Sequence, residues 1–460
     1  MFFGRTNEVK EIKEAIESPK FEAIMIYGRR RVGKTEIIKK ATKETDVLTI
    51  HFECKKVSNK TNIDKLALMF NEKLSLGNIT YNDFDSFLDH VFKISLNKKI
   101  VLIIDEFSFL LNEDFSIESS LATAIDKYKN ESQLKLIISG SYIGIMTKMI
   151  EYESHSYGRF NHIIFVRPFN YLDSSSFYPN YSSEDKIKIY SIFGGLPYFN
   201  SLINPNDTAD NNIINLIVKR DSIIEHEINE MILSETNKVE YLNDVISLIG
   251  SGVHKYSDIV SQIKQKKGAR PDYLLSKLID MNIIEKEAPI NDKSNNKKVQ
   301  YVFSDNLFDF YYQFIFNNFN SINRENPSFF FREFVEEKMN NNYIPRKFEK
   351  IAKEFLLLKN INQKINPVIE EIGKYSFNDS KNKVNREFDV VTRDKYGYIS
   401  YECKYTNTLI NNKVINEEEE QVKNLDINFY KLGFISKEGF EKNVDKEKYN
   451  CFELDDFYKI

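Results

Sequence analysis

The sequence is poor in the residues that mark several protein classes. It has no tryptophan, three cysteines, six histidines, 10 prolines and 16 glycines in 460 residues. Three widely separated cysteines give neither a disulfide scaffold nor the spacing of a zinc site, so a reducing compartment, the cytoplasm, is expected. The uninterrupted apolar runs are far shorter than a bilayer crossing requires and no signal peptide is recognisable, so no membrane association is expected.

The charge is also nearly balanced. Lysine and arginine number 64 against 68 aspartates and glutamates, which gives a net charge of −4 at pH 7. This balance provides no chain-wide attraction to nucleic acid, so any such contact must come from local basic patches. The length and the 42% hydrophobic content predict about three domains, each with a substantial core.

The most specific signal lies near the amino end of the chain. An apolar run at 23–27, typical of a buried strand, leads into a loop that matches G-x-x-x-x-G-K-[ST] and then into a helix-forming segment. The residues of this phosphate loop are Gly28, Arg29, Arg30, Arg31, Val32, Gly33, Lys34 and Thr35. The glycines let main-chain N–H groups point at phosphate, Lys34 is expected to bridge the β- and γ-phosphates, and Thr35 to hold Mg²⁺. ATP and magnesium are therefore the predicted cofactors.

Two carboxylates, Asp105 and Glu106, end a second apolar run at 100–104. This pattern predicts a central parallel strand whose carboxyl end faces the nucleotide. Asp105 would complete the magnesium shell, and Glu106 would polarise the attacking water. A third run, 134–138, ends in Ser139, whose hydroxyl either reads the γ-phosphate or belongs to a turn that closes the strand.

Together these segments resemble the archaeal-type ATPase family, a relative of the AAA+ and STAND nucleotide switches. The likeness rests on the phosphate loop and on Asp105-Glu106. Shorter motifs support it, namely Phe3-Gly4-Arg5 with Glu8, Ser139-Gly140-Ser141, Gly158-Arg159-Phe160, Pro168-Phe169 and Gly194-Gly195-Leu196-Pro197-Tyr198. The resemblance covers roughly the first half of the chain. It implies that Arg159 is an arginine finger or sensor, and a surface arginine is the alternative.

The middle of the chain has the pattern of a winged helix. Amphipathic segments at 256–263 and 271–279 are followed by strand-forming runs at 283–286 and 299–303. Basic residues precede the second helix and occupy the polar wing between the strands; these are Lys264, Lys266, Lys267, Arg270, Lys293, Lys297 and Lys298. Such residues either contact nucleic-acid phosphates or form the solvated face of a lid domain that packs on the nucleotide.

The last segment carries a second chemical pattern. Asp389 lies in one strand-forming run, and Glu402 and Lys404 lie in another at 398–405, where alternation puts both on one face. This set suits a metal-dependent phosphodiester site, with Asp389 and Glu402 as Mg²⁺ ligands and Lys404 orienting the attacking water. Glu349, on an amphipathic helix upstream, is a candidate third carboxylate and metal ligand.

The same set resembles the PD-(D/E)XK nuclease superfamily and looks like the C-terminal domain commonly fused to archaeal-type ATPases. The resemblance implies a nuclease-like domain. Glu387 and the acidic run 417–420 are expected to be solvated charges, and four consecutive glutamates facing a cleft would repel a nucleic-acid backbone.

The sequence thus predicts an α/β multidomain protein with three parts. They are a P-loop ATPase domain with a parallel sheet at 1–205, a helical and winged-helix domain at 206–324, and a restriction-endonuclease-like α/β domain at 325–460. The predicted function is a nucleotide-driven switch coupled to metal-dependent action on nucleic acid, DNA rather than RNA, with a homo-oligomer or a partner protein also open. The alternative is a switch or adaptor whose C-terminal domain binds nucleic acid or a protein without cleaving.

Overall fold

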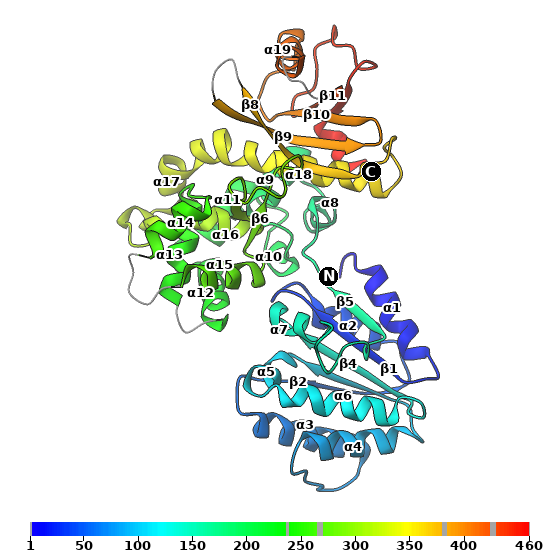
Figure 1. The fold of residues 1–460 in the computed structure, drawn as a ribbon. Helices are drawn as coiled ribbons and strands as arrows, with labels where there is room; N and C mark the ends of the chain where they lie inside the picture. Colours follow the sequence, from blue (N-terminus) through cyan, green and yellow to red (C-terminus); the bar gives the residue numbers. More distant parts are fainter. Residues whose placement is uncertain (1, 236–238, 265–269, 380–383, 424–428, 460) are drawn as a thin grey trace. The chain divides into compact units, whose positions relative to one another are not determined.

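The structure, a computed structural model, describes residues 2–235, 239–264, 270–379, 384–423 and 429–459 (Figure 1). The chain divides into two compact units, Met1–Pro168 and Phe169–Ile460. The first unit ends before the predicted ATPase boundary at 205, and the second contains both the predicted winged-helix region and the predicted C-terminal domain. Among the described residues, no helix has the length and apolar character needed to cross a bilayer.

A five-stranded parallel sheet forms the centre of the first unit. Its strand order is β2-β3-β4-β1-β5. The strands are β1 Glu22–Tyr27, β2 Leu48–Glu53, β3 Ile100–Asp105, β4 Leu134–Gly140 and β5 His162–Phe165. The strands predicted from the three apolar runs are confirmed as β1, β3 and β4. Every residue of β3 and β4 is buried, as expected for central strands covered by helices on both faces (Figure 1).

Helices join and cover these strands. They are α1 Thr6–Glu17, α2 Lys34–Thr42, α3 Asn59–Leu74, α4 Phe84–Ser95, α5 Ser108–Glu113, α6 Ser116–Tyr128 and α7 Ile143–Lys148. Side-chain caps fix where two of them begin: Ser58 accepts a hydrogen bond from the Thr61 N–H at α3, and Asp83 forms a capping box with Ser86 at α4. The helix that follows the phosphate loop, α2, confirms the predicted strand–loop–helix order.

The second unit starts with a helical region. Its helices are α8 Tyr171–Ser174, α9 Ser183–Phe193, α10 Pro197–Ser201, α11 Ala209–Ile213, α12 Ile223–Glu235, α13 Val239–Gly250, α14 Tyr256–Ile263 and α15 Pro271–Asp280. An antiparallel hairpin, β6 Ile284–Glu287 and β7 Gln300–Phe303, follows α15, and Lys255 forms an isolated bridge with Gln300. The predicted helices and strands of this region are therefore present at the expected positions. Helices α16 Asn306–Phe310 and α17 Pro327–Phe330 come next.

A mixed five-stranded sheet lies in the last part of the second unit. Its elements are α18 Ile344–Ile361, β8 Glu371–Asp379, β9 Val384–Asp394, β10 Gly397–Lys404, α19 Asn412–Lys423, β11 Phe429–Ser436 and β12 Asn450–Glu453. The strand order is β12-β11-β10-β9-β8, antiparallel from β8 to β10 and parallel from β10 to β12. Phe457 stacks on Phe355 of α18 with ring centroids 4.2 Å apart, so the 3₁₀ helix Leu454–Tyr458 packs against α18.

One ion pair in the second unit is fully buried. The side chains of Arg324 and Glu225 are 0% and 4% exposed and lie 2.5 Å apart. The Arg324 guanidinium also donates to the carbonyl oxygens of Val218 and Phe319, at 3.2 and 3.1 Å. Because the charges are paired and hydrogen-bonded, the burial is tolerated, but removal of one partner would leave the other charge uncompensated.

We expect Arg324→Leu to lower the free energy of unfolding of the second unit by about 3–5 kcal/mol, the cost of leaving a buried charge unpaired. A urea titration followed by circular dichroism measures it. The matched control is Arg220→Leu, because Arg220 pairs with Glu325 at 2.6 Å while the two side chains are 45% and 63% exposed. That variant should lose less than about 1 kcal/mol. Equal losses in the two variants would contradict the assigned role of the buried pair.

Candidate functional site

The phosphate loop runs from the carboxyl end of β1 to the first residue of α2, and its glycines are required by geometry. Gly28 has a φ of +152°, and a Cβ at this position would lie 2.4 Å from the carbonyl oxygen of Val166. Gly33 has a φ of +95° and caps the amino end of α2. Only glycine meets both requirements without strain, so the loop that the motif predicted is formed here at a helix amino end.

Lys34 is buried at the start of α2. Its ammonium donates to the carbonyl oxygens of Gly28 and Arg29, at 2.9 and 3.2 Å, and to the Ser141 hydroxyl at 2.7 Å. Burial lowers the pKa of Lys34, and the negative charges of Glu106 and Asp105 oppose that shift. Two of these bonds go to the phosphate loop and one goes to Ser141, so a phosphate bound at the loop would compete with these acceptors for the ammonium.

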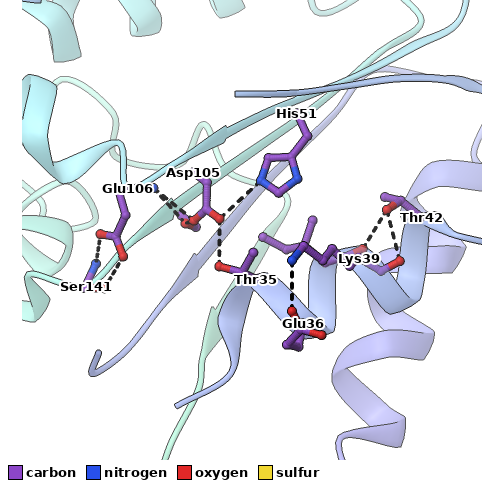
Figure 2. Close-up of polar contacts among 10 residues, drawn as sticks. Thr35, Glu36, Lys39, Thr42, His51, Asp105, Glu106 and Ser141 are labelled. Carbon is purple, nitrogen blue, oxygen red and sulfur yellow. Dashed lines mark hydrogen bonds and ion pairs between the residues drawn. The ribbon is translucent and has the colours of Figure 1, made fainter. Parts of the chain in front are cut away.

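Asp105, at the carboxyl end of β3, accepts hydrogen bonds from side chains of three other elements and from the main-chain N–H of Glu106. Its Oδ2 accepts from the Thr35 hydroxyl at 2.8 Å and lies 3.3 Å from His51 Nε2 (Figure 2). Its Oδ1 accepts from the Ser139 hydroxyl and, at 3.1 Å, from the Glu106 N–H. Burial disfavours the charged form, but the hydrogen bonds from His51, Ser139 and Thr35 outweigh it and lower the pKa of Asp105 to about 2.

The paired oxygens of Thr35 and Asp105 fit a magnesium ion. Mg²⁺ prefers oxygen ligands and is commonly held by one or two carboxylates together with phosphate oxygens and water. The ionised Asp105 carboxylate and the Thr35 hydroxyl supply such oxygens 2.8 Å apart beside the phosphate loop. The predicted metal role of both residues is therefore compatible with their geometry.

Ser141 connects Lys34 with Glu106. Its N–H donates to Glu106 Oε2 at 3.1 Å and its hydroxyl donates to Glu106 Oε1 (Figure 2). The same hydroxyl accepts from Lys34. Ser139, the predicted phosphate reader, instead donates to Asp105. Ser141 thus contacts Lys34 and Glu106, whereas Ser139 contacts Asp105. His51, which also contacts Asp105, belongs to no sequence motif and was not predicted.

Arg159 does not lie at the phosphate loop of its own chain. It precedes β5, whose first residue, His162, pairs with Ile24 near the start of β1, whereas the phosphate loop follows the end of β1. The Arg159 guanidinium is 2.5 Å from Asp126, near the end of α6. The amino and carboxyl ends of parallel strands lie on opposite sides of the sheet. Arg159 therefore lies on the side where the strands begin, away from the phosphate loop.

The predicted C-terminal site residues lie on neighbouring elements of the second unit. Glu402 and Lys404 form an ion pair, which confirms that they share one face of β10. Asp389 of β9 is 3.6 Å from Lys374 of β8, which also contacts Glu387 at 3.1 Å. The carboxylates are therefore partly neutralised by lysines on the same sheet.

Glu349 of α18 belongs to the same electrostatic group. Burial raises the pKa of Glu349 to about 8, with a further contribution from the negative charge of Asp389. Burial also raises the pKa of Asp389, against the attraction of Lys374. Across the described ranges, however, no three His, Cys, Asp or Glu side chains are arranged to hold a metal ion. A metal here would have to use one or two of these carboxylates and complete its shell with substrate oxygens and water.

The acidic run on α19 departs from the sequence expectation. The Glu418 carboxyl hydrogen-bonds with Glu402, and burial together with the charge of Glu402 raises the pKa of Glu418 to about 7. Glu419 accepts from Lys448 at 2.7 Å and from Tyr449 at 2.8 Å. The prediction that the whole run 417–420 is solvated is wrong for these two residues, because α19 packs beside β10 and the last strands.

The loop between β6 and β7, which the sequence predicted as a wing, packs on β8. The Ile290 N–H donates to the Lys374 carbonyl at 2.8 Å, and the Asn291 side chain makes two hydrogen bonds with the main chain of Ser376. Two of its lysines, which were predicted either to contact phosphate or to lie on a solvated face, have acidic protein partners: Lys293 pairs with Glu371 at 3.0 Å, and Lys298 with Asp292 at 2.9 Å. Two others, Lys266 and Lys267, lie outside the described residues.

The parallel sheet, the phosphate loop and the Asp105–Glu106 pair define a P-loop NTPase domain. Residues 2–200 match the family described as an ATPase domain predominantly from Archaea. Residues 311–422 match a family described as archaeal and bacterial proteins of unknown function. These matches support the ATPase and ATP binding, and they assign no activity to the C-terminal region.

Individual proteins are also similar to this chain. The chain is 28% identical over 378 residues to an uncharacterised protein of Methanocaldococcus jannaschii, with 82% of each chain covered. The fold of the present chain is similar to that of a Walker-type ATPase of Pyrococcus abyssi. The TM-score is 0.50 and the identity 19%, and the alignment covers 68% of this chain and 96% of the other. The ORC2 protein of Aeropyrum pernix aligns with a TM-score of 0.48 and 10% identity over 68% of this chain and 93% of its own.

We expect Glu106→Gln to bind ATP but to hydrolyse it about 100-fold or more slowly, because the amide keeps the size of the side chain and an oxygen that can accept from the Ser141 N–H, but loses the charge that polarises water. Steady-state phosphate release and binding of a fluorescent ATP analogue measure the two effects. Lys34→Ala is the control for binding, since it removes the phosphate-binding ammonium and should lose both. Wild-type turnover in Glu106→Gln would require a different group to position the water.

Proposed function

We infer that this protein is an ATP-driven switch whose nucleotide state governs a nuclease-like, metal-dependent site in the C-terminal sheet, acting on nucleic acid and on DNA in particular. The observation that supports this most is the order α18-β8-β9-β10-α19-β11, with Asp389 and Glu402 on adjacent central strands and Lys404 beside Glu402. A helix, three antiparallel strands, a helix and a parallel strand fit the core expected of a restriction-endonuclease-like domain.

Metal chemistry at this site would use carboxylate oxygens. A bound Mg²⁺ lowers the pKa of water and polarises a phosphoryl oxygen. Asp389 and Glu402 would hold the ion, Glu349 lies close enough to influence their charge, and Lys404 would orient the reacting water and phosphate. At the nucleotide site, Thr35 and Asp105 would hold the ion.

The hairpin of β6 and β7 shares a lysine with the candidate site in the C-terminal sheet. Lys374 lies 3.7 Å from Glu287 of β6 and 3.6 Å from Asp389 of β9, so one ammonium is shared between the hairpin and the candidate site. Lys353 of α18 also pairs with Glu287, at 3.2 Å. If the hairpin moved, Lys374 would change partners and the charge at Asp389 would change with it.

The helices α13 to α15 with the β6–β7 hairpin fit a winged helix, which is the proposed nucleic-acid contact. Because Lys293 and Lys298 are paired with acids, contact with DNA phosphates through the wing would require these pairs to open. Arg159 lies on the side of the sheet where the strands begin, so it would contact only a nucleotide bound to another copy of the chain, which would require a homo-oligomer. All three cysteines are free thiols, which supports the proposed cytoplasmic location.

The second candidate is an adaptor that binds nucleic acid or a partner protein without cleaving. The ion pairs Lys404–Glu402 and Lys374–Asp389 favour it, because both predicted metal ligands already have cationic partners. In this case ATP would alter only the exposure of the binding surface.

A cleavage assay with DNA and RNA in Mg²⁺ or Mn²⁺, with and without ATP, separates the two candidates. We expect wild-type protein to cut, and Asp389→Ala to lose about 100-fold or more of the cleavage while it keeps ATP hydrolysis, because the two sites lie in separate units. Glu447→Ala, which alters an exposed acid of the second unit, should cut normally. Absence of cleavage by the wild type under every condition supports the adaptor, and cleavage that survives Asp389→Ala shows that the carboxylates are misassigned.

A further inference from the structure

His51 is a polar residue of the nucleotide site that belongs to none of the sequence motifs. It lies on β2, the edge strand next to β3, and its backbone is in register with Ile103, two residues before Asp105. Alternate residues of a strand point to the same face, so the side chains of His51 and Asp105 lie on the same side of the sheet. This is the face on which α2 presents Thr35 (Figure 2).

The imidazole and the Thr35 hydroxyl approach the same oxygen of Asp105. His51 Nε2 is 3.3 Å from Asp105 Oδ2, and Thr35 Oγ1 is 2.8 Å from it. The other oxygen, Oδ1, is occupied by Ser139 and by the Glu106 N–H. Rotation of the carboxylate would therefore break contacts on both sides, and His51 fixes the orientation of Oδ2 from the strand opposite Ser139.

The two partners differ in their access to solvent. The Asp105 side chain is 3% exposed, whereas that of His51 is 26% exposed. His51 thus stands between a buried carboxylate and water, as outer groups that orient metal-binding carboxylates do. With a proton on Nε2, the ring donates a hydrogen bond to Asp105 Oδ2.

We propose that His51 is a positioning residue for magnesium-dependent ATP hydrolysis, which holds Asp105 Oδ2 toward the cation of the bound nucleotide. The inference rests on the magnesium–ATP site of the proposed function and is independent of its nuclease part. His51 does not touch nucleotide or water in this role; it acts through Asp105.

The test measures the Mg²⁺ dependence of two quantities in the full chain, the affinity for a fluorescent ATP analogue and the rate of phosphate release. In His51→Ala, the affinity without Mg²⁺ should be unchanged, because the phosphate loop and Lys34 are intact. The Mg²⁺ concentration that gives half of the full effect should rise about tenfold in both measurements, the lower end of the usual cost of losing such an outer contact. His51→Gln, whose amide N–H can donate to Asp105, should recover most of the loss.

The chain offers a matched control. His162 of β5 has the same 26% side-chain exposure and also pairs with a carboxylate, Glu11, at 2.9 Å, but it lies at the opposite edge of the same sheet. His162→Ala should leave the Mg²⁺ dependence unchanged. If His51→Ala is unfolded by circular dichroism, His51→Leu, which fills the space without a donor, takes its place.

Three outcomes would overturn the inference. They are a half-effect Mg²⁺ concentration within about twofold of wild type in the folded His51 variant, an equal shift in His162→Ala, or no recovery in His51→Gln. A wild-type protein without Mg²⁺-dependent binding or turnover would instead refute the magnesium–ATP site itself, so the two failures are distinguishable.

Discussion

The buried carboxylate of Asp105 is the constraint on which the nucleotide site depends. A charge in the protein interior is unfavourable unless hydrogen bonds compensate for lost water. Here the donors come from β2, α2 and β4 and from the adjoining main chain, through His51, Thr35, Ser139 and the Glu106 N–H. These elements are distant in sequence, so the carboxylate is satisfied only when the strand order β2-β3-β4-β1 is complete. Folding and assembly of the site are therefore coupled.

The candidate carboxylates of the second unit are compensated in a different way. Asp389 and Glu402 each have a lysine partner, and Lys374 also reaches Glu287 of the hairpin. A shared lysine can change partners at little cost, because each ion pair is partly exposed and contributes little alone. The charge of Asp105 is thus compensated by hydrogen bonds from several fixed elements. A movement of the hairpin, in contrast, would alter the ion pairs of the C-terminal carboxylates.

The sequence predicted the parts of the structure that depend on local pattern. The phosphate loop, β3 with its two terminal acids and the shared face of Glu402 and Lys404 follow from spacing and alternation. It could not predict His51, because a histidine inside an apolar strand has no meaning until the neighbouring strand is known. Tertiary contacts between segments far apart in the chain likewise determine the position of Arg159 beside Asp126 and the pairing of Lys293 with Glu371.

Titration calorimetry of ATP against the wild-type protein and Asp105→Asn, each with and without Mg²⁺, tests the central claim most directly. The substitution removes the charge and keeps the shape of the side chain. The account predicts that Mg²⁺ tightens ATP binding in the wild type by about tenfold or more, and that Asp105→Asn binds ATP without Mg²⁺ normally but loses most of this enhancement. Full enhancement in Asp105→Asn would contradict a nucleotide site organised around this carboxylate.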